Sequence, residues 1–296
     1  MAEKPIFTGA ATALITPTNA NGVDYDKLRR LIDWQIEEGI DALVICGTSG
    51  ESSTLTDAEH KKTIAYAIEC VNGRVPVIAG TGSNETDYAI ELSRFAGSAG
   101  ADAVLVVTPY YNKATQNGLI KMYSTIADST TAPVIMYNVP SRTGVNIEPS
   151  TYAALADHGN IRAIKEASGN IGKIVETVSL VGDKLDIYSG NDDQIVPIMS
   201  MGGLGVISVL SNIMPKKTSE LCHKYLSGDV AGAAKMQAEY IPIIKALFCE
   251  VNPIPVKAAM AAMGWCENFL RLPLTEMEPA HEKMLLEEMR KLALIK

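Results

Sequence analysis

The sequence predicts an α/β protein, a (β/α)₈ or TIM barrel with a small C-terminal helical extension. Eight short apolar runs alternate along the chain with longer amphipathic segments. Most of these runs are apolar throughout rather than at every second position, which is typical of parallel strands covered on both faces. Eight such strand–helix units within residues 1–225 match a barrel, whose usual size is about 250 residues.

Each apolar run has a clear end, because Gly, Thr, Ser, Asn or Pro closes it. The eight runs are residues 9–17, 41–48, 75–82, 101–109, 132–140, 161–168, 185–192 and 205–211. A doubly wound sheet is the alternative, but it normally carries a Gly-rich turn after its first strand. Here the first run continues as LITPTNANG, without a GxGxxG motif, so the barrel is favoured.

Two of the intervening segments show clear helix boundaries. In residues 25–39 the apolar side chains recur at i, i+3 and i+4, and Gly39 suits the position just after the helix. Residues 56–73 begin with a Thr56–Glu59 capping box and end in Asn-Gly. Helices therefore follow the predicted strands, as the barrel requires.

The C-terminal part of the chain has a different pattern. From about residue 226 the apolar runs stop, and two helical segments follow, 230–250 and 281–296, with the Pro-rich NPIPVK between them. We therefore expect a catalytic barrel over residues 1–225 and a helical domain over residues 226–296.

Composition limits the classes of partner. The chain is 47% hydrophobic and 20% charged, with a formal net charge of −8 at pH 7. Binding to a phosphate backbone needs clustered Lys and Arg, so a nucleic-acid partner is not expected. No apolar run reaches the roughly 18 residues that a membrane span needs, and the N-terminus lacks a signal-peptide pattern. The sequence predicts a soluble, cytoplasmic protein with no membrane partner.

The cysteines and histidines indicate neither disulfides nor a metal site. The five cysteines are scattered without a CxxC pair, and no two of the four histidines have the spacing of metal ligands on one element. These residues are Cys46, Cys70, Cys222, Cys249 and Cys266, and His60, His158, His223 and His281. We expect a reducing compartment and no metal.

The run IRAIKEAS, residues 161–168, carries a lysine at its fifth position. Side chains alternate along a strand, so Lys165 shares a face with Ile161. Ala163 and Ala167 lie on that face too and leave room for an adduct. Burial disfavours the charged form of lysine, and a neutral amine can attack a carbonyl. The alternative is a lysine that reaches solvent or pairs with a carboxylate.

The neighbouring strand ends favour the nucleophile, because barrel active sites lie at the carboxyl ends of the strands. Tyr137 closes the run before Lys165 and is within reach of the amine across neighbouring strands. Imine chemistry needs proton transfer, which a phenol coupled to a second hydroxyl can supply. Thr48 and Tyr111, at the ends of the second and fourth runs, could complete such a relay. The alternative is a buried tyrosine that only bonds a carbonyl.

Two further groups are suited to holding a carboxylate. GTSG, residues 47–50, offers backbone N–H groups and the hydroxyls of Thr48 and Ser49 at a turn. Arg142, in PSRTG, has a planar fork that can bind a carboxylate with two hydrogen bonds. A plain strand-ending turn and a solvated loop arginine are the alternatives.

These motifs coincide with those of a known family. GTSGE, TPYY, YNVPSRTG, IKEASGN, GVISV and NPIPVK, in this order, closely resemble the 4-hydroxy-tetrahydrodipicolinate synthase (dihydrodipicolinate synthase) family over essentially the whole chain. That family belongs to the pyruvate-dependent class I aldolases, which are Schiff-base-forming lyases on (β/α)₈ barrels. N-acetylneuraminate lyase belongs to the same superfamily and is the alternative.

The resemblance implies roles for the catalytic residues. Lys165 would form a Schiff base with pyruvate, without a metal or another cofactor. Tyr137 would relay protons, and Thr48 would link it to Tyr111 of a partner subunit. The pyruvate carboxylate would lie on Thr48 and Ser49, where this chain has Thr-Ser in place of two threonines. The backbone at Gly190 and Ile207 would line the same pocket.

The resemblance also implies the second substrate and the assembly. The enamine on Lys165 would attack the aldehyde of L-aspartate 4-semialdehyde, a step of diaminopimelate and lysine biosynthesis. Arg142 would hold the carboxylate of this substrate, whereas the sugar-acid lyases typically lack an arginine here. A homotetramer, built as a dimer of dimers, is expected.

The remaining expectations concern regulation and one acidic residue. In lysine-inhibited members the effector site uses residues that match Ser52, Ser53, His60, Asn84 and Tyr110, together with a glutamate. This chain has Tyr88 at the glutamate position, so weak or absent inhibition by lysine is expected. Glu166, beside Lys165, has no assigned role, and strand alternation directs its side chain towards the helical layer.

Overall fold

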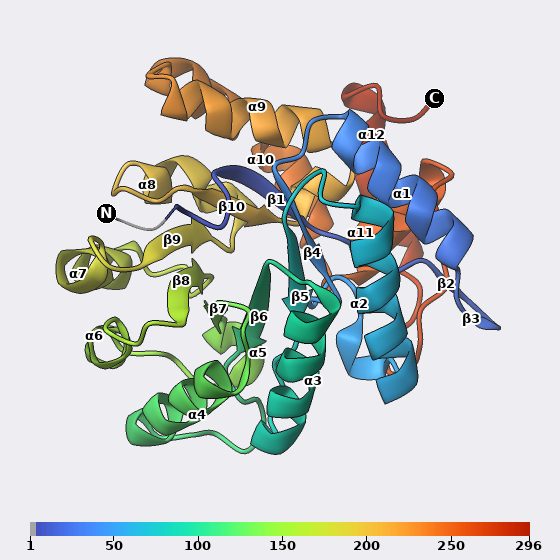
Figure 1. Cartoon of the computed structure of the whole chain (residues 1–296). Coiled ribbons are helices and arrows are strands. Elements are labelled where there is room, and N and C mark those ends of the chain that lie inside the picture. Colours follow the sequence, from blue (N-terminus) through green and yellow to red (C-terminus); the bar gives the residue numbers. More distant parts are fainter. Residues whose placement is uncertain (1–3) are drawn as a thin grey trace.

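A computed structural model describes residues 4–296 and confirms the predicted barrel. The eight parallel strands form one closed sheet in the order β1-β10-β9-β8-β7-β6-β5-β4, with the helices outside it (Figure 1). Its strands are β1 Gly9–Ala13, β4 Ala42–Ile45, β5 Val77–Gly80, β6 Ala103–Val107, β7 Val134–Asn138, β8 Ile161–Glu166, β9 Asp186–Ser189 and β10 Gly205–Ser208. Each strand lies within one of the predicted apolar runs.

The helices follow the strands in sequence and cover the outside of the barrel. Those of the barrel region are α1 Tyr25–Glu37, α2 Asp57–Val71, α3 Thr86–Ala99, α4 Gln116–Ser129, α5 Pro140–Thr143, α6 Pro149–Leu155, α7 Ile171–Val181, α8 Ile195–Met199 and α9 Pro215–Leu226. The helical C-terminal region contains α10 Val230–Leu247, α11 Ile254–Ala262 and α12 Pro279–Lys291. In this region α10 packs against α9 and α12.

The two detailed helix predictions are confirmed at their ends. Helix α1 stops at Glu37, and Gly39 follows with a φ of 84°, the left-handed conformation that glycine adopts readily. Helix α2 begins after Thr56, and the capping box between Thr56 and Glu59 is formed in both directions.

Two elements are not anticipated from the sequence. A short antiparallel hairpin, β2 Thr18–Asn19 with β3 Gly22–Val23, interrupts the connection from β1 to α1. The Pro-rich NPIPVK does not only separate helices, because α11 begins at Ile254 within it. Proline is tolerated there because the first helical positions need no intrahelical N–H partner.

The apolar core is divided into two clusters by the barrel wall. The outer cluster fills the space between strands and helices, and the smaller inner cluster fills the barrel. Ala163 and Ala167 of the β8 region belong to the inner cluster, as predicted. Ile161 packs instead with the outer cluster, at a place where the register between β7 and β8 shifts. The inner cluster therefore forms the floor beneath the polar groups at the strand ends.

Candidate active site

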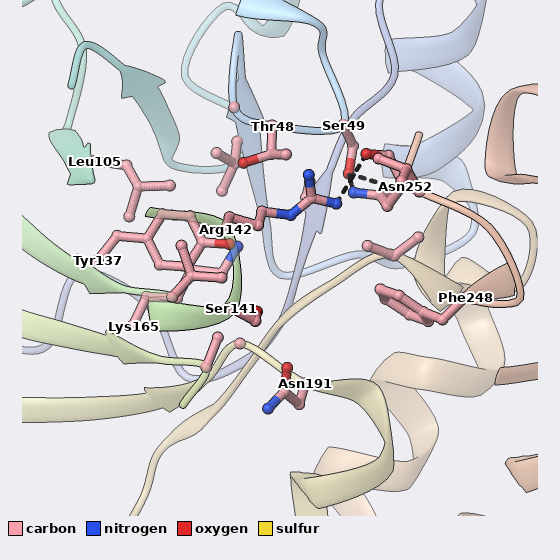
Figure 2. Close-up of a pocket in the computed structure, with 18 of the residues that line it drawn as sticks. Thr48, Ser49, Leu105, Tyr137, Ser141, Arg142, Lys165, Asn191, Phe248 and Asn252 are labelled. Atoms are coloured by element: carbon pink, nitrogen blue, oxygen red, sulfur yellow. Dashed lines mark hydrogen bonds between the residues drawn. The ribbon is translucent and has the colours of Figure 1, made fainter. Parts of the chain in front are cut away.

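A cavity of about 470 Å³ opens at the carboxyl ends of the barrel strands. Figure 2 shows that it is enclosed partly by strand ends and partly by the chain segment between α10 and α11. The polar residues that line it are Thr48, Ser49, Tyr137, Ser141, Arg142, Lys165, Asn191, Glu250 and Asn252. Five of the residues predicted for the site, Thr48, Ser49, Tyr137, Arg142 and Lys165, are among them.

Lys165 lies on the inner face of β8 and points into the cavity (Figure 2). Its side chain is 5% exposed, and within residues 4–296 no carboxylate or other acceptor makes an ion pair or hydrogen bond with its Nζ. Burial lowers the pKa of Lys165 to about 7, although the charge of Asp192 opposes the shift and that of Arg142 adds to it. A large fraction of the amine is therefore neutral at physiological pH.

Tyr137 is paired directly with Lys165 in the sheet. The register between β7 and β8 places the two residues opposite each other, and Lys165 Nζ lies 4.2 Å from the centroid of the Tyr137 ring. Burial raises the pKa of Tyr137, while the charge of Arg142 and a hydrogen bond with Thr48 lower it. The structure thus brings together the amine, the phenol and the hydroxyl of the predicted relay.

Thr48 and Ser49 lie on the loop after β4. Cys46, at the start of this loop, has a φ of 56°, and a side chain on Gly80 of the neighbouring strand would approach the Cys46 carbonyl oxygen to 2.2 Å. Only glycine fits at that position, so the backbone bend that turns GTSG over the cavity depends on Gly80. Ser49 is buried, and its Oγ accepts a hydrogen bond of 3.0 Å from Asn252 Nδ2.

Arg142 extends across the cavity from α5 (Figure 2). Its Nη2 donates a hydrogen bond of 2.8 Å to the backbone carbonyl of Asn252. The guanidinium is held at one end, and the rest of its donor edge lies in the cavity. An anion in the cavity could accept from it.

Of the two backbone positions predicted to line the pocket, Gly190 lines the cavity and Ile207 does not. Gly190 lines the cavity, and a Cβ atom there would lie 3.1 Å from Lys165 Cε and 2.7 Å from Ala167 Cβ. Ile207 is buried in the inner cluster and does not line the cavity. Val209, the residue that follows β10, lines it instead.

Tyr111 lies apart from the cavity of its own chain. Its side chain is 92% exposed, and its backbone has a φ of 73°. It is the most exposed large hydrophobic residue in the described part of the chain. The structure therefore does not join Tyr111 to Thr48 and Tyr137 within one subunit.

Four of the five residues predicted for the effector site line a second cavity of about 350 Å³. Ser52, Ser53, His60 and Tyr110 line it, and so does Tyr88. The His60 ring is hydrogen-bonded to the Gly80 carbonyl at 2.8 Å, and burial lowers the pKa of His60. Asn84 does not line this cavity, and its backbone carbonyl accepts from Asn112.

Sequence reasoning missed the contribution of the C-terminal region to the cavity. Phe248, Glu250, Val251 and Asn252 form one wall, and Asn252 alone contacts both Ser49 and Arg142. The signal was present in NPIPVK, a motif inside an otherwise plain helical region. Further along the same motif, the buried Lys257 forms an ion pair with Glu51 of the GTSGE motif.

Clustered metal ligands and membrane-spanning helices are both absent from residues 4–296. No group of three or more His, Cys, Asp and Glu side chains there is arranged to hold a metal ion. None of the helices in the same range is both long and apolar enough to cross a bilayer.

Comparison with known proteins identifies close relatives. The model of the dihydrodipicolinate synthetase family matches residues 6–292. The 4-hydroxy-tetrahydrodipicolinate synthase of Lachnoclostridium phytofermentans is 59% identical over 292 residues, which cover 98% of this chain and 99% of that protein. The crystal structure of dihydrodipicolinate synthase from Aquifex aeolicus has a TM-score of 0.96 at 45% identity and covers 97% of this chain and 99% of its own. A monomeric dihydrodipicolinate synthase variant has a TM-score of 0.96 at 43% identity, with 98% of each chain covered.

Proposed function

The chain belongs to the dihydrodipicolinate synthetase family, and we propose that Lys165 is the amine that forms a Schiff base with pyruvate in its reaction. This family contains lyases of the class I aldolase type, so the enzyme class and the synthase function predicted from the sequence are confirmed. The observation that supports the role of Lys165 is its geometry. It is a buried amine in contact with the Tyr137 ring, with no acceptor for its Nζ among residues 4–296, and it lines the cavity over the strand ends.

The chemistry follows from the neutral amine. Lys165 Nζ attacks the keto carbon of pyruvate, and the carbinolamine loses water to give an iminium. Loss of a proton from the pyruvate methyl group gives the enamine, whose carbon then attacks the aldehyde of L-aspartate 4-semialdehyde. Cyclisation by the substrate amine releases Lys165. Each of these steps moves a proton, and the Tyr137 hydroxyl, coupled to Thr48, is placed to carry it.

Two anion-binding groups orient the substrates. The GTSG turn, with Thr48 and Ser49, lines the same cavity as Lys165 and suits the pyruvate carboxylate. Arg142 extends across the cavity from α5 to the Asn252 carbonyl, and its guanidinium suits the carboxylate of the second substrate. The rival assignment as an N-acetylneuraminate lyase does not explain why an arginine occupies this position.

The exposed Tyr111 supports an active site completed by a second copy of the chain. A phenol that is 92% exposed in one subunit can reach the Thr48 hydroxyl of another subunit and extend its relay. A dimer is then the smallest fully active unit, and a homotetramer is a dimer of such dimers. All five cysteines are free, which supports a reducing compartment such as the cytoplasm.

Lysine is proposed to be at most a weak inhibitor. The second cavity presents the Tyr88 phenol, and a phenol is a poorer partner for an ammonium group than a carboxylate. Assays across physiological lysine concentrations should therefore show little loss of rate. A Tyr88→Glu variant supplies the missing carboxylate, so lysine should inhibit it more strongly than the unaltered protein. Strong inhibition of the unaltered protein would contradict the proposal.

Trapping of the Schiff base tests the role of Lys165. The protein is incubated with pyruvate, reduced with borohydride, digested and analysed by mass spectrometry. The expected result is one reduced pyruvate adduct, on the peptide that contains Lys165. Absence of an adduct, or an adduct on another lysine, would overturn the assignment.

A further inference from the structure

Glu166 occupies the face of β8 opposite to Lys165. Strand alternation sends Lys165 into the barrel and Glu166 into the helical layer, where its side chain is only 4% exposed. Within residues 4–296 the carboxylate has no cationic partner in an ion pair. A buried carboxylate without a counterion is costly unless hydrogen bonds satisfy both of its oxygens.

Three donors satisfy this carboxylate. Ser168 N donates to Oε1 at 2.7 Å, and the Tyr152 hydroxyl donates to Oε2 at 3.0 Å. Asn138 Nδ2 donates to both oxygens, at 3.3 Å to Oε1 and 3.2 Å to Oε2. An ionised carboxylate is the side chain of this length that accepts on both oxygens. An amide would present N–H groups to donors on one side, so the site requires Glu rather than Gln.

Asn138 connects this carboxylate to the base of the loop that carries Arg142. It lies directly opposite Glu166 in the sheet and follows Tyr137 in the chain. Its Nδ2 also donates to Asn146 Oδ1 at 2.9 Å, and its Oδ1 accepts from Ile147 N at 3.1 Å. Asn138 thus ties the two ends of the loop together, and α5 with Arg142 lies between them.

We propose that Glu166 is a positioning residue, whose carboxylate holds the Lys165–Tyr137 pair in register and closes the loop that carries Arg142. The proposal rests on the roles given above to Lys165, Tyr137 and Arg142. One buried group thereby sets the distance from amine to phenol on one side and the placement of the guanidinium on the other. A shift of about 1 Å in such groups can reduce a rate about 100-fold.

Glu166→Gln tests this role, because it keeps the shape and places an amide beside the Asn138 amide. We expect kcat to fall at least about tenfold and KM for L-aspartate 4-semialdehyde to rise, while pyruvate still gives the Lys165 adduct. The charge of Glu166 is also a minor cause of the raised pKa of Tyr137. The alkaline limb of the pH profile should therefore move to lower pH in the variant, which a purely structural defect would not produce.

Glu148→Gln is the matched control. Glu148 borders the same loop and accepts from Asn146 Nδ2 at 2.9 Å, but its side chain is 41% exposed. This variant should retain the kinetic constants and pH profile of the unaltered protein. Tyr152→Phe removes the donor to Oε2 and leaves the Glu166 carboxylate and Asn138 in place, so kcat should fall by less than in Glu166→Gln.

The outcomes separate this inference from the proposed function. Failure to trap an adduct in the unaltered protein would refute the role of Lys165 itself. Normal trapping, together with unchanged kcat, KM and pH profile in folded Glu166→Gln, would refute only the role of Glu166. If Glu166→Gln does not fold, Tyr152→Phe decides, since the proposal requires the loss of the Oε2 donor to lower kcat. Unchanged kcat in folded Tyr152→Phe would then refute the role of Glu166.

Discussion

Two lysines of this chain are buried almost equally and have opposite surroundings. Lys165, on β8 in the barrel, is 5% exposed and contacts the face of Tyr137 without an acceptor for its Nζ among residues 4–296. Lys257, on α11 in the C-terminal region, is 0% exposed, pairs with Glu51 and donates to Thr18 Oγ1 at 2.6 Å. Because both side chains are buried, the two lysines differ in whether their amines have hydrogen-bond acceptors.

The acceptors decide which protonation state burial favours. A buried ammonium is stable when a carboxylate and a hydroxyl replace the lost water, as they do for Lys257. Without them burial favours the neutral amine, and the pKa of Lys165 is lowered to about 7. The same residue type is therefore a structural tie between barrel and C-terminal region at one place and the proposed nucleophile at the other.

The largest expected effect is the loss of catalysis in Lys165→Met. Methionine keeps the length and apolar stem of the side chain but cannot form an imine. We expect kcat/KM to fall by at least about 10⁴-fold and the borohydride-trapped adduct to disappear. Steady-state kinetics with both substrates measure the first effect and mass spectrometry the second. Residual activity within tenfold of the unaltered protein would show that another group performs the attack.

The second expected effect is a loss of stability in Lys257→Met. The substitution leaves the Glu51 carboxylate buried and unpaired, and one of its oxygens already lacks a hydrogen bond. Breaking a buried pair in this way typically costs about 3–5 kcal/mol in free energy of unfolding. Urea denaturation measures it. Combining Glu51→Gln with Lys257→Met removes the unpaired charge and should recover part of the lost free energy of unfolding. If the single and the double variant lose equal stability, the unpaired carboxylate is not the cause.

The sequence predicts one of these lysines and not the other, for physical reasons. Lys165 is visible because its context is local, since strand alternation and two alanines are properties of IRAIKEAS itself. The partners of Lys257 and Asn252 are remote, because the sequence separation is 206 for Lys257 and Glu51 and 203 for Asn252 and Ser49. Periodicity also predicts the eight strands, but it carries no information about which C-terminal residues close the cavity.

The third expected effect is a gain of stability in Lys165→Met, opposite in sign to that of Lys257→Met. The unfolded chain keeps the ordinary lysine pKa of 10.5, whereas the folded chain has a pKa of about 7. Protons therefore bind preferentially to the unfolded chain, so stability from this group is present above pH 10.5 and is lost as the pH falls through 7.

Replacing the Lys165 amine removes the loss of stability that arises because protons bind preferentially to the unfolded chain. At pH 7 the free energy of unfolding of Lys165→Met should exceed that of the unaltered protein by on the order of 2–4 kcal/mol, with the difference shrinking as the pH rises. Urea denaturation of both proteins at pH 6, 8 and 10 measures it. A difference that does not depend on pH would mean that Lys165 carries its charge in the folded protein.

The smallest expected effect is the pH dependence of trapping in the unaltered protein. The neutral fraction of an amine with a pKa of about 7 changes about tenfold per pH unit below 7 and is nearly constant above 8. The initial rate of adduct formation with pyruvate should follow it, so that the rate at pH 6 is about one tenth of the plateau. Lys257 should give no adduct at any of these pH values, because its amine is paired with Glu51. A trapping midpoint near pH 10 would place Lys165 among ordinary charged lysines and remove the contrast between the two.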